Sequence, residues 1–386
     1  FDVRVRCLAS ALFIFWRALW TATALFVPCK VLSVLTGLDT RLLVLIVGAA
    51  ATVYTVAGGM RAVMWTDVLQ FFILFGGLIF GVVWVALRGP GGFGGMLRMA
   101  LEGEQLAPFA PFDASVLSFD PRIRITVWSC WIGTFVAFLA RYGADQSVVQ
   151  RYFTARSLAT AQKGFILNAV CAVGALLCLA LFGIAMRAHA VSAGLLDGGI
   201  SRPPLFYFAA FLKSFPFGIS GLMIAGLLAA TMSTVDSCIN SCTAAYITDF
   251  HNRFSGIGAT GRGLAAPRRD RLFAVLFGAV GITLAMFVGR FGSIFEIANR
   301  IINGFGSPLL ALFLLGMFSN RVNAHGMLTG GILGAVMSGF ISVTVQNLAL
   351  HYYAVLNLLV TAALCYFFSF LFGGSQRDTG PGAGVS

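Results

Sequence analysis

The stretch GLLAATMSTVDSCINSCTAAYITDF, residues 226–250, sets polar side chains at regular intervals in an otherwise apolar segment. At 3.6 residues per turn, five of these side chains share one face of a helix: Ser233, Asp236, Ser237, Asn240 and Ser241. A carboxylate inside an apolar helix usually faces a partner helix or a cavity. The oxygens of this seam suit a hard cation, but small polar residues also hold membrane helices together. The seam alone leaves both interpretations open.

The composition of the whole chain agrees with a membrane solvent. Of 386 residues, 59% are apolar and only 10% are charged, and the mean hydropathy is +0.90. Soluble chains are about one quarter charged, so an ordinary soluble enzyme, a disordered tail and a nucleic-acid binder are excluded. A spanning helix needs about 20 apolar residues. The apolar runs predict an all-α protein with ten spans in one transmembrane domain over residues 1–386: 8–36, 42–58, 68–87, 125–142, 164–186, 216–248, 272–289, 301–319, 325–346 and 354–372.

The connections predict how the chain is placed in the membrane. Residues 88–124 are rich in Gly and Pro and are expected to form an irregular extracytoplasmic loop. Residues 249–271 are expected to form a cytoplasmic loop, and residues 373–386 a flexible tail. The loops on the side of the N-terminus carry more Lys and Arg, so both ends of this chain are predicted to be cytoplasmic in a multi-pass plasma-membrane protein, or an inner-membrane protein in a bacterium.

Two further stretches combine polar residues with helix breakers. In TVYTVAGGMRAVMWTDVLQFF, residues 52–72, Gly58 and Gly59 permit a tight turn, and Asp67 opens the next helix. A carboxylate there suits the helix dipole and is equally available to a cation. In RYGADQSVVQRYFTARSLATAQKG, residues 141–164, Gly143 is expected to end a span and a basic surface helix to follow. Interrupted helices are where transporters commonly hold their solute.

Four motifs together make the chain resemble a known family. They are YTVAGGMRAVMWTDVLQ (54–70), ADQSVVQRYFTARS (144–157), AGLLAATMSTVDSCINS (225–241) and GFGSPLLALFLLGMFSNRVNAHGMLTGGILG (304–334). In this order they are similar to the sodium/solute symporters, which include the sodium/glucose cotransporters. The resemblance implies a LeuT-type fold of five plus five helices in inverted repeat. Aligned on these motifs the chain starts at the third core helix, so a leading helix and core helices one and two are expected to be missing from it.

The resemblance also implies sites for sodium, the only cofactor-like ion expected. The family's main sodium site corresponds here to the carbonyl of Ala230 and the hydroxyls of Ser233 and Thr234. A second sodium site, found in some members, corresponds to Asp67, Asp236 and Ser237.

The solute site implied by the resemblance departs from that of the sugar carriers. Their aromatic pair corresponds to Arg141 and Tyr142, their glutamine to Asn299, and their lysine to Ala172. Arg17 is a second cation within a predicted span. Because guanidinium groups bind carboxylates in a bidentate manner, the predicted solute is a small organic anion, either a monocarboxylate or sialate-like.

The predicted activity is therefore sodium-coupled symport of a carboxylate by alternating access. The four His are scattered near loops and form no catalytic constellation, so an enzyme is not expected. Three alternatives stay open: proton coupling through Asp67, a sugar or polyol as the solute, and a transport-inactive sensor of the same fold. The expected partners are sodium, a small solute and the bilayer, with no nucleic acid, and the sequence leaves the oligomeric state open.

Overall fold

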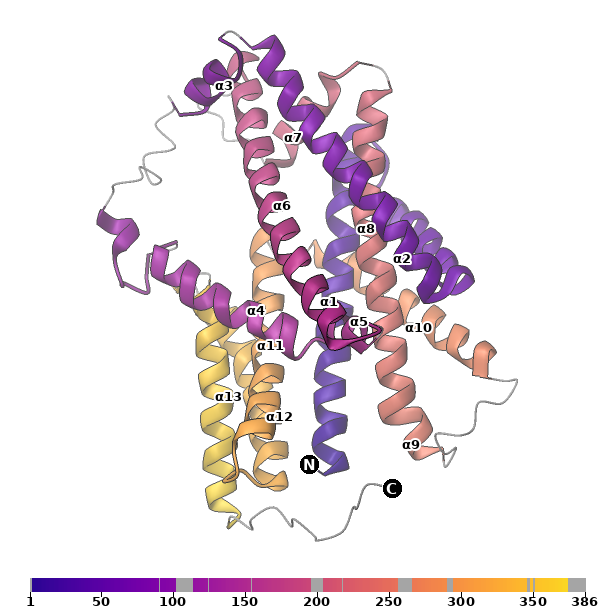
Figure 1. The fold of residues 1–386 in the computed structure, drawn as a ribbon, viewed down its shortest axis with the longest axis vertical. Helices are drawn as coiled ribbons and strands as arrows, with labels where there is room; N and C mark the ends of the chain where they lie inside the picture. Colours follow the sequence, from indigo (N-terminus) through magenta and orange to yellow (C-terminus); the bar gives the residue numbers. More distant parts are fainter. Residues whose placement is uncertain are drawn as a thin grey trace.

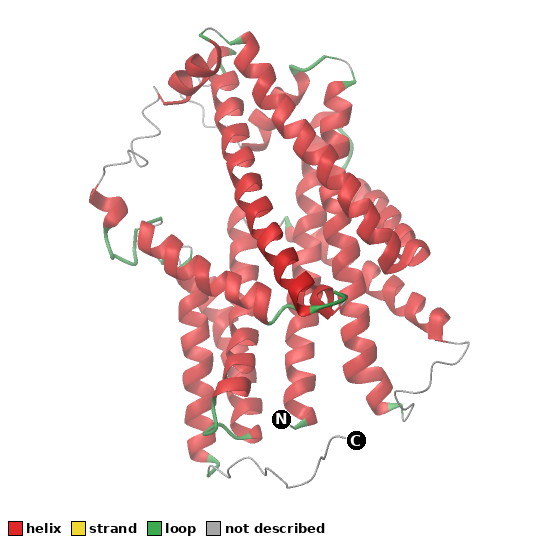
Figure 2. Cartoon of the chain, viewed as in Figure 1, coloured by secondary structure: helices red, strands yellow, loops and turns green. Residues whose placement is uncertain are grey.

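The computed structural model describes residues 2–89, 91–101, 114–123, 125–153, 155–195, 204–216, 218–255, 266–289, 294–345, 348–349 and 351–373, and all regular structure within them is helical (Figures 1 and 2). The α-helices are α1 (Val3–Thr36), α2 (Thr40–Arg88), α3 (Gly92–Leu101), α4 (Thr134–Gly143), α5 (Gln146–Phe153), α6 (Leu158–Ser192), α7 (Pro204–Lys213), α8 (Ile219–Tyr246), α9 (Asn252–Phe254), α10 (Ala266–Val288), α11 (Ile294–Phe318), α12 (Ala324–Thr344) and α13 (Tyr352–Leu371). A 3₁₀ turn (η2, Ala114–Leu117) and two π-helical turns (η3, Ser129–Gly133; η4, Ile247–His251) complete the set.

Eight segments of the described chain are long and apolar enough to cross a membrane, which is fewer than the ten predicted. They are Val3–Thr36, Thr40–Gly58, Trp65–Arg88, Leu158–Ser192, Ile219–Phe254, Arg268–Val288, Ala324–Thr344 and Tyr352–Leu371. Within α11, whose side chains are described only from residue 304, Gly304–Phe318 forms a shorter apolar helix.

The predicted span 125–142 differs because its helix is irregular. Its first part winds as the π-helical turn η3 before α4 begins. There Gly133 lies so close to the backbone of His351 that a β-carbon at this position would collide with it. The helical backbone is nevertheless continuous from residue 127 through η3 to the end of α4, as is usual for a π-helical turn inserted in an α-helix.

The predicted turn at Gly58 and Gly59 takes the form of a sharp change of direction inside helical backbone. The helix α2 is assigned from Thr40 through Arg88, yet the hydroxyls of Tyr54 and Thr66 are hydrogen-bonded. A straight helix would place residues twelve positions apart about 18 Å from each other. The chain therefore doubles back between them, and α2 supplies two separate spans, as the sequence predicted.

Two predicted loops contain more helix than expected. The connection 88–124 includes α3 and η2. The connection predicted at 249–271 is shorter, because helical backbone continues through η4 and α9 to Phe254 and resumes in α10 at Ala266. Residues 374–386 of the predicted tail lie outside the described residues.

Helix α1 is the central element of the molecule. It packs against α2, α8, α10 and α11 (Figure 1). One apolar cluster joins its residues Leu25 and Cys29 to Ile239 of α8. Another joins Phe13 and Trp16 to the α4 and α11 side of the molecule. The middle of α1, between these clusters, is consequently held on several sides and provides a fixed wall for a site.

Helices α12 and α13 pack through small residues repeated every four positions. Gly326, Gly330 and Gly334 of α12 face Ser369, Cys365 and Thr361 of α13. A β-carbon on Gly334 would lie 2.6 Å from Thr361 Cγ2, so side chains larger than hydrogen do not fit. Close backbone approach of this kind is how membrane helices gain dispersion contacts without a hydrophobic driving force.

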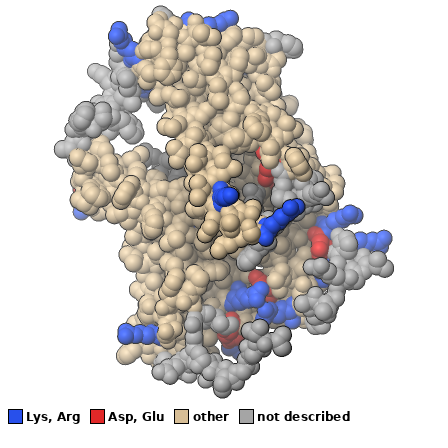
Figure 3. Space-filling model, in the orientation of Figure 1, with Lys and Arg blue, Asp and Glu red and all other residues tan. Residues whose placement is uncertain are grey.

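The outer surface is strongly apolar. On the face drawn in Figure 3, charged atoms cover little of the area. Along the first half of α6 the large apolar side chains are exposed: Phe165, Ile166, Leu167, Val170, Val173, Leu176 and Leu177. An apolar surface of this extent is incompatible with water as the surrounding solvent. Lipid is the environment that suits it.

Candidate functional site

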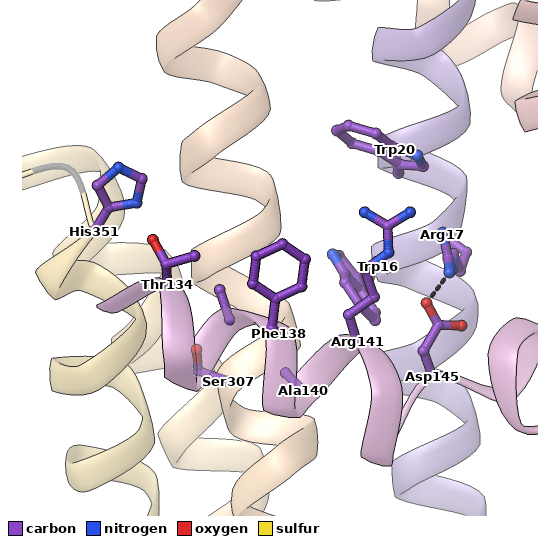
Figure 4. A pocket seen from close by; sticks show the side chains of 11 residues that line it. Trp16, Arg17, Trp20, Thr134, Phe138, Ala140, Arg141, Asp145, Ser307 and His351 are labelled. Atoms are coloured by element: carbon purple, nitrogen blue, oxygen red, sulfur yellow. Dashed lines mark ion pairs between the residues drawn. The ribbon is translucent and has the colours of Figure 1, made fainter. Parts of the chain in front are cut away.

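A cavity of about 210 Å³ lies beside the middle of α1 (Figure 4). Its walls come from α1, α4, α11 and the connection before α13, and eleven residues line it: Trp16, Arg17, Trp20, Thr134, Ala137, Phe138, Ala140, Arg141, Asp145, Ser307 and His351. We call this cavity the upper cavity. It combines three aromatic rings with two guanidinium groups, a carboxylate and an imidazole. Burial lowers the pKa of His351, so this imidazole is neutral at pH 7.

Arg17 and Asp145 form a buried ion pair on one wall of the upper cavity (Figure 4). Their side chains are 12% and 0% exposed. Arg17 Nη2 also donates to Ser147 Oγ at 2.6 Å, and that hydroxyl donates to Asp145 Oδ1 at 2.7 Å. Asp145 Oδ1 further accepts from the backbone N–H of Ser147 at the start of α5. The ion pair thus ties the break between α4 and α5 to α1.

The predicted solute residues fall into two groups. Arg17 and Arg141 line the upper cavity, and Figure 4 shows Arg141 reaching from α4 toward the two tryptophans. Tyr142 lines a neighbouring cavity between α4 and α6, which Arg141 also lines, and its hydroxyl accepts a hydrogen bond from Asn168 Nδ2 at 2.9 Å. The side chain of Asn299 lies outside the described residues.

The residues predicted for the second sodium site meet between α2 and α8. Ser233 Oγ donates to Asp67 Oδ1 at 2.6 Å, which joins the two helices. Asp236 is fully buried and lies close enough to Asp67, Tyr54 and Ser237 to interact with them. Among the described residues, neither carboxylate oxygen of Asp236 has a partner at hydrogen-bonding geometry. Buried acceptors of this kind are costly unless they are satisfied, and a cation would satisfy both.

The residues predicted for the main sodium site lie one turn apart on α8. The hydroxyl of Thr234 donates to the carbonyl of Ala230 at 3.0 Å, and Ser233 points to Asp67. The three oxygens therefore sit beside the Asp67 and Asp236 cluster rather than in a separate part of the fold.

A direct contact connects this polar stretch of α8 to the upper cavity. Arg17 Nη1 lies 4.0 Å from Cys238 Sγ, and Cys238 follows Ser237 in the chain. The guanidinium of Arg17 contacts both Cys238 of α8 and Asp145. A displacement of Cys238 or of Asp145 would therefore shift this guanidinium relative to the other residue.

Sequence reasoning missed several residues of these sites. Tyr54 and Thr66 were not singled out, because their proximity depends on the reversal within α2. Trp16 and Trp20 look like ordinary core aromatics in a sequence. The pairing of Arg17 with Asp145 had a signal, since two opposite charges in or near spans are expected to find each other.

The model of the sodium:solute symporter family matches residues 2–334 of the chain. The sodium-dependent multivitamin transporter of Oryctolagus cuniculus is 29% identical over 352 residues, which cover 89% of this chain and 53% of the relative. Sodium-coupled monocarboxylate transporter 2 of Bos taurus is 28% identical over 354 residues, covering 89% and 54%. The chain thus spans about half the length of these relatives.

The helix arrangement is similar to that of a solved Na⁺-coupled sialic acid symporter in a substrate-bound, outward-open state. The TM-score is 0.80 at 23% identity, and the match covers 98% of this chain and 76% of the other. The likeness supports a LeuT-type arrangement of helices.

The family is one of membrane transporters and not of enzymes. Its model covers most of the chain, and the motif order, the helical membrane fold and the polar seam of α8 agree with it. This chain is a multi-pass membrane protein that belongs to the sodium:solute symporter family.

Proposed function

We propose that the protein imports a small organic monoanion, with a carboxylate as its charged group, together with sodium. The solute binds in the upper cavity, sodium binds on α8, and alternating access moves both inward. The N-terminal and C-terminal ends of this chain face the cytoplasm in this proposal, as the distribution of Lys and Arg in the connections indicates.

The observation that carries the proposal is that two guanidinium groups, Arg17 and Arg141, line the upper cavity. A guanidinium group offers a carboxylate a planar pair of N–H donors. Trp16, Trp20 and Phe138 supply apolar surface for the body of the solute. The names of relatives agree with this chemistry, because a monocarboxylate and sialic acid both carry one carboxylate.

Sodium supplies the driving force in this proposal. Moving one charge through 100 mV is worth about 2.3 kcal/mol, but one sodium carried with one monoanion moves no net charge. A second sodium at Asp67, Asp236 and Ser237 makes uptake sensitive to the membrane potential. The unpartnered carboxylate oxygens of Asp236 support a cation at this place.

Uptake into proteoliposomes tests the proposal directly. The full-length protein is reconstituted and offered labelled lactate, butyrate, nicotinate, sialic acid and glucose, each with an inward gradient of sodium, of protons at constant sodium, or of neither. We expect sodium-dependent uptake of at least one of the acids and none of glucose. Uptake of glucose alone would contradict the anionic solute, and uptake driven by protons without sodium would contradict sodium coupling.

A further inference from the structure

A second cavity, of about 500 Å³, lies along α1 next to the upper cavity. It is called the lower cavity here. Polar groups of Arg6, Ser10, Gln146 and Asp249 lie on its wall among apolar side chains such as Phe13 and Ala144. A cavity with convergent polar groups on an otherwise apolar wall is the usual form of a small-molecule site.

An ion pair stands at one end of the lower cavity. Arg6 Nε donates to Asp249 Oδ1 at 2.6 Å, and the hydroxyl of Ser10 donates to Asp249 Oδ2. The Asp249 side chain is 8% exposed and the Arg6 side chain 52% exposed. Asp249 belongs to the π-helical turn η4, at the end of the helix that carries the proposed sodium residues. Turns of this kind occur frequently at functional sites.

The two cavities are stacked along one face of α1. Arg6, Ser10, Phe13 and Arg17 follow a spacing of four, three and four residues, which keeps them on one side of the helix. Arg6 and Phe13 line the lower cavity, and Arg17 lines the upper one.

The partition between the cavities is the break between α4 and α5. Ala144 and Gln146 line the lower cavity, whereas Asp145 between them lines the upper one. The two cavities therefore meet at the Arg17, Asp145 and Ser147 cluster, and the far end of the lower cavity is held by a second cluster of the same composition, Arg6, Asp249 and Ser10.

We propose that the lower cavity is a second, release-side binding site for the anionic solute, in which Arg6 receives the carboxylate and the Arg6–Asp249 pair closes the exit to the cytoplasm. This proposal rests on the proposed function. In Figure 1, α1 begins and α8 with α9 ends at the same end of the molecule, so the pair joins two helix ends. The solute leaves the upper cavity, passes the α4–α5 break, and is held by Arg6 until the exit opens.

The chemistry of Arg6 suits both tasks. A guanidinium presents five N–H donors in a planar fork, and Arg6 contacts Asp249 through Nε. The Arg6 side chain is about half exposed, and a guanidinium group can bind a carboxylate in bidentate fashion. When the solute carboxylate takes this place, it competes with Asp249 for the same cation. Binding therefore loosens the contact that closes the exit.

Uptake kinetics separate this site from the upper one. Arg6→Gln is compared with Arg6→Lys and with Arg4→Gln, the same change at an exposed arginine outside both cavities. The probe is whichever labelled acid of the uptake panel enters fastest. We expect Arg6→Gln to lower the maximal rate at least fivefold with the external KM changed less than twofold, Arg6→Lys to recover part of the rate, and Arg4→Gln to behave as the parent. An unchanged maximal rate, or a KM raised as strongly as by Arg141→Gln, would overturn the proposal.

Cys7 gives a readout that needs no solute. Its Sγ lies 3.6 Å from the backbone oxygen of Asp249, so it reports on the same contact. In a variant that keeps Cys7 as its only cysteine, we measure labelling by a membrane-impermeant maleimide applied from the cytoplasmic side, with sodium or with choline. We expect sodium to slow the labelling, and Asp249→Asn to speed it at least fivefold and remove the sodium effect. A variant keeping only Cys29, which is fully buried, should stay unlabelled throughout.

The outcomes also separate this proposal from the proposed function. If the parent protein takes up no acid with sodium, the proposed function fails, and sodium-sensitive labelling of Cys7 still tests the exit. If the parent transports normally but Cys7 labelling is the same in Asp249→Asn, with and without sodium, the exit at Arg6 and Asp249 is refuted while the proposed function stands.

Discussion

At the scale of single residues, two of the buried carboxylates each lie beside an arginine. Arg17 has Asp145, and Asp249 has Arg6 and Ser10. Removing one partner of a buried pair leaves an uncompensated charge and costs about 3–5 kcal/mol. Substitution of Arg17 or Asp145 therefore tests stability as much as function. Arg141 lines the same cavity from a different helix and is a second residue at which to test solute binding.

We predict that Arg141→Gln raises the apparent KM for the transported acid at least tenfold, because a carboxylate loses its cationic partner. A tenfold change corresponds to about 1.4 kcal/mol of binding free energy. The measurement is initial uptake against solute concentration in proteoliposomes at saturating sodium. Arg141→Lys keeps the charge but not the planar fork, so its KM should lie between those of the parent protein and Arg141→Gln. An unchanged KM in Arg141→Gln would remove this residue from the site.

The imidazole of His351 predicts a pH effect on stability. Burial lowers its pKa below the ordinary value of 6.5, so the unfolded chain binds a proton that the folded chain does not. Stability is therefore lost as pH falls from 6.5 toward the folded pKa, and is fully present above pH 6.5. His351→Gln should flatten the dependence of the melting temperature on pH between 5 and 7. Equal slopes in the two proteins would show that His351 does not contribute.

At the scale of elements, the contacts between helices decide which residues work together. The reversal within α2 brings Tyr54 and Asp67 to the same part of α8. The break between α4 and α5 places Asp145 opposite Arg17. The contact between α12 and α13 is of a different kind, because small residues let the two helices pack closely.

The α12–α13 seam gives a stability prediction with a matched control on the same helix. A β-carbon on Gly330 would lie 2.5 Å from the backbone nitrogen of Cys365, whereas one on Gly339 meets Phe305 at an ordinary 3.7 Å. Overpacking of this kind costs about 1–3 kcal/mol. Gly330→Ala should lower the melting temperature in detergent by several degrees, and Gly339→Ala should leave it nearly unchanged. Equal melting temperatures for Gly330→Ala and Gly339→Ala would show that α12 and α13 accommodate the added methyl group without loss of stability.

At the scale of the whole molecule, α8 connects three functions that lie at different heights. Its middle carries the proposed sodium residues, Cys238 touches Arg17, and the π-helical turn at its end holds Asp249. A movement of α8 relative to α1 would therefore change contacts at the proposed sodium site, in the upper cavity and at the proposed exit. This arrangement gives sodium a structural route to the solute.

We predict that the double substitution Ser233→Ala with Thr234→Ala abolishes the stimulation of uptake by sodium, because both hydroxyl ligands are lost. The protein should still reach the membrane, which surface labelling verifies. Uptake in sodium and in choline is compared at equal solute. Full sodium stimulation in the double variant would refute the assignment of the main site.

The second sodium site predicts a dependence on membrane potential. With two sodium ions per monoanion, a potassium diffusion potential that is negative inside should accelerate uptake several-fold. Asp67→Asn weakens the cation site between α2 and α8, so the acceleration should disappear while uptake driven by the sodium gradient is retained in part. A parent protein that is insensitive to the potential would argue for one sodium per monoanion.

The sequence by itself determined the solvent and the helical class, because a strongly apolar composition requires lipid and lipid requires helices that satisfy their own backbone hydrogen bonds. The four motifs at 54–70, 144–157, 225–241 and 304–334 indicated the family. Eight of the ten spans predicted from the sequence coincide with helices of the described chain that are long and apolar enough to cross a membrane. The irregular turn at 129–133 escaped it, since the close approach of Gly133 to His351 joins residues far apart in the chain. Only the tertiary structure decided that Asp145 meets Arg17 and that Arg6 meets Asp249. Such pairs depend on how helices cross, and helix crossing is fixed by packing between distant segments rather than by any local pattern.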